Sequence, residues 1–231
     1  MTQSHLQLDP LDSPHPIPWN WVLANLTPSE SYSASGSRYY RTQSLLSPNG
    51  HYASYSRIQM QVHPEFLHSR VSSVLFIENL QTGDLQVITA ASPLADNPFT
   101  ATSETEKMVD GKVAILIPIA WSETSDRILA REFESLFGSG IASDYAVIWD
   151  RQMNRASTVA PTRIHYTNAV LLGWSQKYPD RVLFRAGMMG EEDWGLWTVD
   201  RTGQTNAAPE DRPIVFGQTV NSLWAGPQAH L

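Results

Sequence analysis

The feature of this chain that most constrains its fold is a pattern of short apolar runs and turn residues in residues 168–203. One apolar run ends at Trp174, a polar turn follows, and a second apolar run covers residues 182–184. A third run, residues 194–199, ends before an Asp-Arg-Thr-Gly turn. Short runs that alternate with turn residues are typical of β-hairpins, so the pattern predicts an antiparallel meander.

The same pattern recurs twice earlier in the chain. Leu46, Trp121 and Trp174 each end an apolar run, and each is followed by a serine and a polar turn. The last two copies are roughly 50 residues apart, and a long connection at residues 90–112 lengthens the first interval. Repeats of this length with four strands each are typical of propeller blades. We therefore predict an all-β fold, a small β-propeller-like array of antiparallel four-stranded sheets with three clear units.

This repeat resembles that of TolB-type β-propellers, which also occur as the propeller domains of prolyl oligopeptidases. The matching positions are residues 46–50, 76–77 and 82–83 in the first copy, Trp121, Ser122 and residues 148–150 in the second, and Trp174, Ser175, residues 196–200 and Gly203 in the third. Only the first copy has the family's turn, at Pro48-Asn49-Gly50.

The resemblance covers residues 40–226 and implies a propeller fold without the peptidase activity, because in the peptidases catalysis belongs to a separate hydrolase domain. This chain has no room for such a domain. The chain as a whole also resembles a group of uncharacterised cyanobacterial proteins.

The two ends of the chain are expected to differ in order. Residues 1–16 form a short polar segment, so we expect a flexible tail there. A single domain over residues 17–231 follows it. Trp19, Trp21 and Leu23 recur at every second position, which predicts a strand with one buried face. Pairing of this strand with a C-terminal strand at residues 220–224 would form a fourth unit from both termini and close the array. An open stack of units that dimerises is the alternative.

Composition excludes several classes of function. The net charge is −7, which argues against binding of nucleic acid. There is no cysteine, so disulfides, thiolate nucleophiles and cysteine-based zinc sites are excluded. No apolar run is long enough to span a membrane. We expect a soluble, cytoplasmic protein without a cofactor.

Two clusters of polar residues are candidates for binding. His63, Glu65 and His68 lie within six residues of one another on a proline-containing loop. The acids Glu191, Glu192 and Asp193 precede Trp194 in the third repeat. A metal site needs three or four converging ligands, and the spacing of the histidines does not predict convergence. We therefore assign no catalytic residue and no metal site, and propose both clusters as binding residues.

The tryptophans divide by their position in the repeats. Trp121, Trp149, Trp174 and Trp197 fall at strand positions and are expected in the core. Trp19, Trp21, Trp194 and Trp224 lie near ends and loops, where we expect mainly a structural role; an exposed binding patch formed by one or two of them is the alternative. Asp144, Asp150 and Asp200 are expected at strand ends, where they accept hydrogen bonds from turn amides.

These features favour a non-catalytic binding or scaffold protein that docks a protein partner through loops on one face. The connection at residues 91–112 and the loop at residues 134–144 are expected to face the partner. The alternative is an enzyme, a hydrolase or lyase acting on a small or glycan-like ligand, with acids and histidines from several loops meeting over a central channel. A homodimer is the further assembly to consider.

Overall fold

The computed structural model describes residues 9–26, 36–95 and 110–221. These residues form fifteen β-strands, one α-helix and one short 3-10 turn, so the protein is all-β, as predicted. Twelve of the strands form three antiparallel units of four consecutive strands each. The first two units belong to one ten-stranded sheet, joined by a parallel pairing of Val71 with Val113, and the third unit belongs to a five-stranded sheet.

Unit 1 consists of β2 (Ser44–Leu46), β3 (Tyr52–Val62), β4 (Arg70–Asn79) and β5 (Leu85–Ile88). Unit 2 consists of β6 (Lys112–Trp121), β7 (Arg127–Leu136), β8 (Ala142–Asp150) and β9 (Arg155–Val159). Unit 3 consists of β10 (Asn168–Ser175), β11 (Val182–Gly187), β12 (Gly195–Val199) and β13 (Thr205–Ala207). The remaining strands are β1 (Gly36–Arg41), which pairs with β3, and the short β14 (Pro213–Ile214) and β15 (Gln218–Val220).

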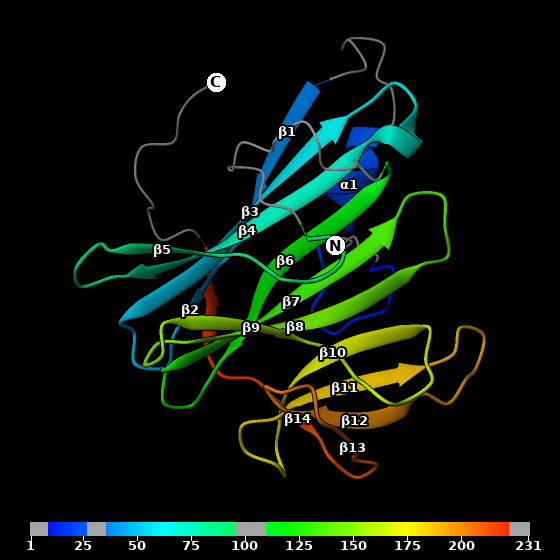
Figure 1. The fold of residues 1–231 in the computed structure, drawn as a ribbon. Coiled ribbons are helices and arrows are strands. Elements are labelled where there is room, and N and C mark those ends of the chain that lie inside the picture. The colour runs from blue at the N-terminus through cyan, green and yellow to red at the C-terminus, as the bar shows by residue number, and fades with distance from the viewer. Residues whose placement is uncertain (1–8, 27–35, 96–109, 222–231) are drawn as a thin grey trace, which may run out of the picture.

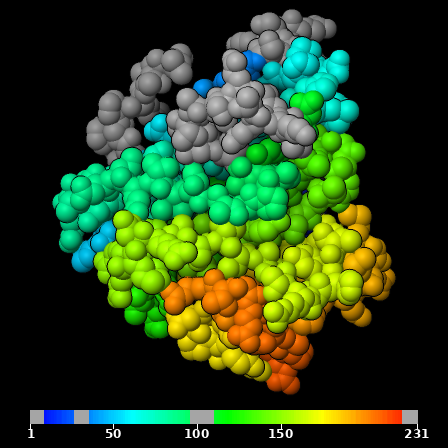
Figure 2. Space-filling model, in the orientation of Figure 1, coloured from blue at the N-terminus to red at the C-terminus, as the bar shows by residue number. Residues whose placement is uncertain are grey.

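Unit 2 lies between units 1 and 3, and the same order is visible on the molecular surface (Figures 1 and 2). One apolar cluster packs unit 1 on unit 2, with Leu75 and Ile77 against Leu116 and Trp149. A larger cluster includes residues of units 2 and 3 together with β3 and the N-terminal helix. Each sheet therefore buries at least one face against its neighbour.

The hairpin between the first two strands is closed in a similar way in all three units. The backbone N–H groups of Ser47, Ser122 and Ser175 donate to a carbonyl at the start of the following strand or next to it, over 2.8, 2.8 and 2.9 Å, and the hairpin of unit 3 is one residue longer than the other two. Units 1 and 2 have a residue with positive φ at the same position of this turn, Gly50 and Ser125, and unit 3 has one later, at Asp180; the later turns have Gly83, Asn154 and Gly203 at equivalent positions. The repeat predicted from the sequence is therefore present at the level of the backbone.

Tryptophan indoles link successive units. The Nε1–H group of Trp121 donates to the carbonyl oxygen of Leu45 in unit 1 over 3.1 Å. In the same way, Trp174 donates to the carbonyl oxygen of Trp121 in unit 2 over 2.9 Å. Trp121, Trp149 and Trp174 are buried, which confirms their predicted place in the core, and Trp197 is partly buried against the same core.

The C-terminal segment, residues 213–220, crosses the first strands of all three units. Every second residue pairs with the equivalent position of a different unit: Ile214 with Trp174, Phe216 with Trp121, and Gln218 with Leu46. The prediction that a strand at residues 220–224 pairs with Trp19 and Trp21 is therefore wrong. Val220 pairs with Ser44 of β2 instead, and residues 222–231, including Trp224, lie outside the described residues.

Gly217 allows this segment to approach the sheets closely. Its φ is +110°, and a Cβ atom there would lie 2.9 Å from the carbonyl oxygen of Leu46. We expect Gly217→Ala to lower the free energy of unfolding by about 1–3 kcal/mol in a urea titration. Gly190→Ala is the control, because Gly190 also has positive φ but has no atom within 4 Å of the added carbon. An equal loss in the two variants would contradict the close approach.

The predicted strand around Trp19 and Trp21 is a helix, α1 (Trp19–Leu26). Its start is set by Pro18, whose carbonyl accepts from the N–H of Val22 over 3.2 Å, and proline suits the first turn of a helix. Val22 is fully buried, and Trp19 packs on Phe133 with ring centroids 5.9 Å apart. Trp19, Val22 and Leu26 are spaced by three and four residues, so they share one helical face, and packing of this face on the core favours the helix.

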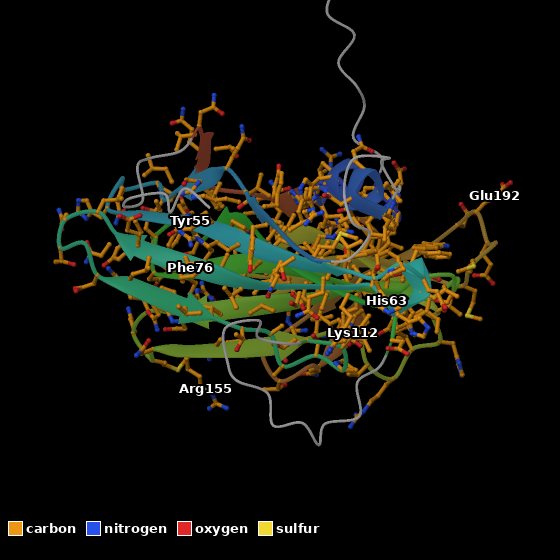
Figure 3. All side chains as sticks on the ribbon, turned by 90° about the horizontal axis from the view of Figure 1, so that it is seen from above. Tyr55, His63, Phe76, Lys112, Arg155 and Glu192 are labelled. Carbon is orange, nitrogen blue, oxygen red and sulfur yellow. The ribbon has the colours of Figure 1, made fainter. Side chains whose placement is uncertain are left out.

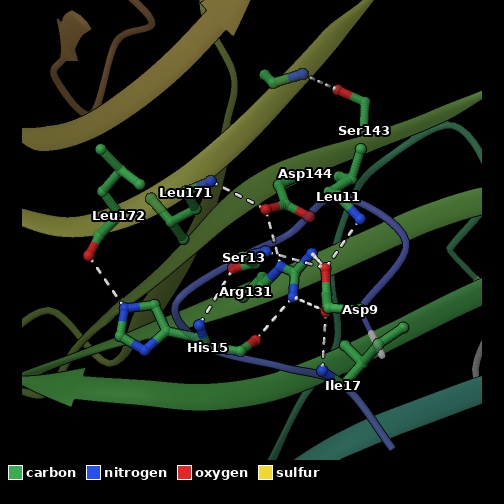
Figure 4. A network of polar contacts seen from close by, with 11 residues as sticks. Asp9, Leu11, Ser13, His15, Ile17, Arg131, Ser143, Asp144, Leu171 and Leu172 are labelled. Atoms are coloured by element: carbon green, nitrogen blue, oxygen red, sulfur yellow. Dashed lines mark hydrogen bonds and ion pairs between the residues drawn. The ribbon is translucent and has the colours of Figure 1, made fainter. Parts of the chain in front are cut away.

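Residues 9–16, which we predicted to belong to a flexible tail, are held in place by a buried arginine (Figure 4). Arg131 of β7 is fully buried, and its Nη1 atom lies 2.7 Å from both Asp9 Oδ2 and the carbonyl oxygen of His15. Its Nε atom lies 2.8 Å from Oδ2 of Asp144 on β8. Asp144 in turn accepts a hydrogen bond from the N–H of Leu171 on β10. It therefore connects units 2 and 3, whereas we had expected it to accept from the amides of a turn.

Candidate functional site

Three loops gather at one end of the stacked units. Each joins the second and third strands of a unit: residues 63–69 in unit 1, residues 137–141 in unit 2 and residues 188–194 in unit 3. Neighbouring loops touch, because a Cβ atom at Gly138 would lie 2.6 Å from Leu67 and one at Gly140 would lie 3.3 Å from Met189. We call these three loops together the loop end.

Large apolar side chains project from all three loops. They are Phe66 and Leu67 (49% and 46% exposed), Ile141 (59%), and Met188 and Met189 (40% and 57%). Single exposed apolar residues are normal on a protein surface, whereas apolar residues grouped on adjoining loops mark interaction sites. Methionine adds adaptability, because its unbranched side chain fits partners of different shape.

The first predicted cluster is brought together, with one additional acid. His68 Nδ1 lies 2.7 Å from Asp110 Oδ2, and His68 Nε2 lies 3.1 Å from Glu65 Oε2. The Asp110 carboxylate raises the pKa of His68, and Glu65 contributes in the same direction. The His63 ring packs edge-on against that of His68, with centroids 5.1 Å apart.

This cluster is not arranged as a metal site. Both nitrogen atoms of His68 bind carboxylates, so neither is left with a lone pair for a cation. Throughout the three described stretches, no group of three or more His, Asp or Glu side chains is placed to hold a metal ion.

The second predicted cluster lies at the same end of the molecule. Glu191, Glu192 and Asp193 are exposed on the β11–β12 loop, and Figure 3 shows Glu192 pointing outward at the end where His63 also lies. Trp194 is only partly exposed. Its Nε1–H group donates to the carbonyl oxygen of Met188 over 3.1 Å, so it supports its own loop.

The structure thus places all seven predicted residues at the loop end but shows no direct contact between the two clusters. Neither of the two described cavities is lined by any of them. The apolar residues of this surface were not among the predicted site residues, although apolar pairs such as Phe66-Leu67 and Met188-Met189 inside polar loops were a visible signal. Trp19 and Trp21, two candidates for an exposed patch, pack against the core instead.

The loops predicted to face a partner are described only in part. The connection at residues 91–112 includes residues 96–109, which lie outside the described residues. The loop predicted at residues 134–144 is shorter than expected, because β7 continues to Leu136 and β8 begins at Ala142. What remains, residues 137–141, is the central loop of the loop end.

Comparison of the chain with protein-family models, with curated proteins and with solved structures gave no match. In the part of the chain that the structure describes, no helix is both long and apolar enough to cross a membrane.

Proposed function

We propose that this chain is a non-catalytic binding protein that docks a protein partner through the loop end. The observation that carries the proposal is the group of exposed apolar side chains on three adjoining loops. A protein interface of this kind has an apolar centre surrounded by polar residues. At the loop end, Phe66, Leu67, Ile141 and the methionine pair would form the centre.

The charges around this centre suggest the chemistry of the partner. Glu65 and Asp110 lie beside the apolar residues of unit 1, and Glu191, Glu192 and Asp193 lie beside those of unit 3. His68 lies between the first two acids, and their carboxylates raise its pKa, which favours its charged form. The surface is therefore acidic on balance, and we expect a partner with an apolar patch bordered by lysine or arginine, because complementary charges guide association.

The proposed architecture is an open stack of propeller-like units. Three four-stranded meanders with equivalent hairpins, packed face to face, support a relationship to TolB-type propellers. The C-terminal segment joins the three units along their first strands. A homodimer that adds further units remains part of the proposal, as does the cytoplasmic location expected from the sequence.

The docking surface can be tested with two matched double variants. Phe66→Ser with Met189→Ser removes apolar area from the loop end. Leu85→Ser with Val87→Ser removes similarly exposed residues, 51% and 47% exposed, from β5. The control site is far from the loop end. Leu85 pairs with Glu78, close to the last residue of β4, whereas the unit 1 loop of the loop end comes immediately before the first residue of β4.

We expect the loop-end variant to lose at least about tenfold in affinity for a partner isolated with the wild-type chain, a change of about 1.4 kcal/mol. The β5 variant should bind like the wild type. Binding should weaken as salt is raised if the acidic border contributes. Isothermal titration calorimetry with the purified partner measures the affinity of each variant and its dependence on salt. Equal binding by both variants would reject the loop end as the interface.

A further inference from the structure

A separate cleft lies among the first strands, away from the loop end. It has a volume of about 540 Å³ and is lined by residues of β1, β2, β6 and β15, by residues of the β1–β2 connection, and by residues between 14 and 18 of the N-terminal segment. Small-molecule sites usually have volumes of about 300–1,000 Å³. Leu45, Ile117 and Ile119, each 7% exposed, form its apolar floor.

The lining carries polar groups but no ionic side chain. The polar side chains are those of His15, Tyr40, Thr42, Gln43 and Thr219, and no Asp, Glu, Lys or Arg is among the lining residues. A charged ligand would lose hydration in this cleft without gaining an opposite charge, which is costly. The chemistry of the lining therefore selects a neutral ligand that forms hydrogen bonds.

His15 is held as a hydrogen-bond acceptor. Its Nε2 atom lies 3.0 Å from the carbonyl oxygen of Leu172, which can only accept, so Nε2 carries the hydrogen and Nδ1 keeps a lone pair. Burial lowers the pKa of His15, which keeps the ring neutral near neutral pH. The backbone of His15 is held as well, because its carbonyl oxygen accepts from Arg131 over 2.7 Å (Figure 4).

Prolines make the walls rigid and poor in donors. Pro14, Pro16, Pro18 and Pro118 all line the cleft, and each has a fixed φ and no backbone N–H group. The cleft is therefore formed before a ligand arrives, which reduces the entropy lost on binding. A ligand suited to these walls must bring its own N–H or O–H donors.

We propose that this cleft binds a neutral, hydroxyl-rich ring compound of the size of a monosaccharide or disaccharide. A sugar ring has an apolar C–H face for Ile117, Ile119 and Leu45. Its hydroxyls both donate and accept, so they match the imidazole acceptor of His15, the hydroxyls of Tyr40, Thr42 and Thr219, and the amide of Gln43. This site is independent of the protein-docking surface.

The test is a titration of the full chain, labelled with ¹³C at isoleucine methyl groups, with glucose, galactose, mannose, sucrose and trehalose. We expect at least one of these sugars to shift the methyl signals of Ile117 and Ile119 in a saturable way. Glucuronate and glucosamine, which add one negative or positive charge to the same ring, should bind at least about tenfold more weakly than the neutral parent sugar.

Two variants of β15 distinguish the cleft from other surfaces. Thr219→Trp fills the cleft and should reduce sugar binding by at least about tenfold. Gln218→Trp is the matched control, because successive side chains of a strand point to opposite faces and Gln218 does not line the cleft. The Gln218 variant should bind like the wild type, and thermal melting of both shows that they fold.

Several outcomes would overturn the proposal. One is the absence of saturable shifts with every neutral sugar, and another is equal binding by the Thr219 and Gln218 variants. Binding of indole but of no sugar would identify an aromatic site instead. A further such outcome is sugar binding by a chain that ends at residue 221 but not by the full chain. It would show that the cleft is filled by the chain's own C-terminal residues and not by a sugar.

Discussion

Arg131→Met is expected to lower the free energy of unfolding by about 3–5 kcal/mol, because it leaves two buried carboxylates without their cation. Arg131 and Asp144 have fully buried side chains, and that of Asp9 is 4% exposed. Methionine retains much of the side-chain length, so the loss is mainly electrostatic. It also frees the N-terminal segment, since Arg131 binds both Asp9 and the carbonyl oxygen of His15.

Urea unfolding monitored by tryptophan fluorescence measures this loss. Arg155→Met is the matched control, because Arg155 is exposed on β9 of the same unit, and exposed substitutions usually change stability by less than about 0.5 kcal/mol. A loss of under about 1 kcal/mol in the Arg131 variant would mean that the buried ion pairs do not hold the N-terminal segment.

The three units could be predicted from the sequence because their signals are local. Each hairpin combines an apolar run, a serine and a turn residue within a few positions, and the observed bonds of Ser47, Ser122 and Ser175 use these residues. The tryptophans that end the first strands also appeared at equivalent positions. Local patterns of this kind predict strands and turns reliably, whether or not the sheets later pack together.

The terminal segments could not be predicted, because contacts distant in sequence decide their structure. Asp9 and Arg131 are 122 positions apart, and nothing near either residue indicates the other. The C-terminal segment pairs with three different units through alternate residues, so its strand signal did not show which partners it has. Trp19 and Trp21 fitted both a strand and a helix, and packing on Phe133 and Tyr40 supports the helix.

The candidate site could be predicted only in its polar part. His63, Glu65 and His68 were chosen by residue type, and the structure adds Asp110, which is 42 positions from His68. The contact between the loops of neighbouring units depends on the stacking of the sheets. The sequence therefore identified polar residues of two loops and indicated that the third loop faces a partner, but it did not show that the three loops form one surface.

Stability is expected to change with pH through acids that are buried inside unit 2. Burial raises the pKa of Glu132 well above its usual value, and the nearby Glu134 carboxylate adds to this effect. Burial also raises the pKa of Glu134, and it raises that of Asp144 to about 6. The side chain of Glu132 on β7 is 3% exposed, and its buried Oε2 atom has no hydrogen-bond partner within the described parts of the chain.

The sign of the effect follows from proton binding. In the unfolded chain these acids lose their protons near their ordinary pKa values, whereas in the folded chain they keep them to higher pH. Between the two pKa values the folded state binds more protons, so the free energy of unfolding falls as pH rises. For Asp144, from 3.8 to about 6, the loss is about 3 kcal/mol. His15 acts in the opposite direction below its ordinary pKa, because burial lowers its folded pKa.

Glu132→Gln isolates the contribution of this carboxyl from those of the other acids. Below the ordinary pKa of glutamate, both the protonated acid and the amide are uncharged, so we expect the variant and the wild type to have similar stability. As pH rises, only the wild type must bury a charge or hold a proton against the solvent. The variant should therefore gain about 1.4 kcal/mol relative to the wild type for each pH unit, until the folded pKa of Glu132 is reached.

Urea titrations of both proteins at about pH 5 and about pH 8 measure this difference. Glu123→Gln serves as the control, because Glu123 is exposed in the β6–β7 turn and should give no pH-dependent gain. A stability difference for Glu132→Gln that is the same at both pH values would show that this carboxyl reaches solvent or a cation. In that case β7 would not bury the Glu132 side chain as the structure shows.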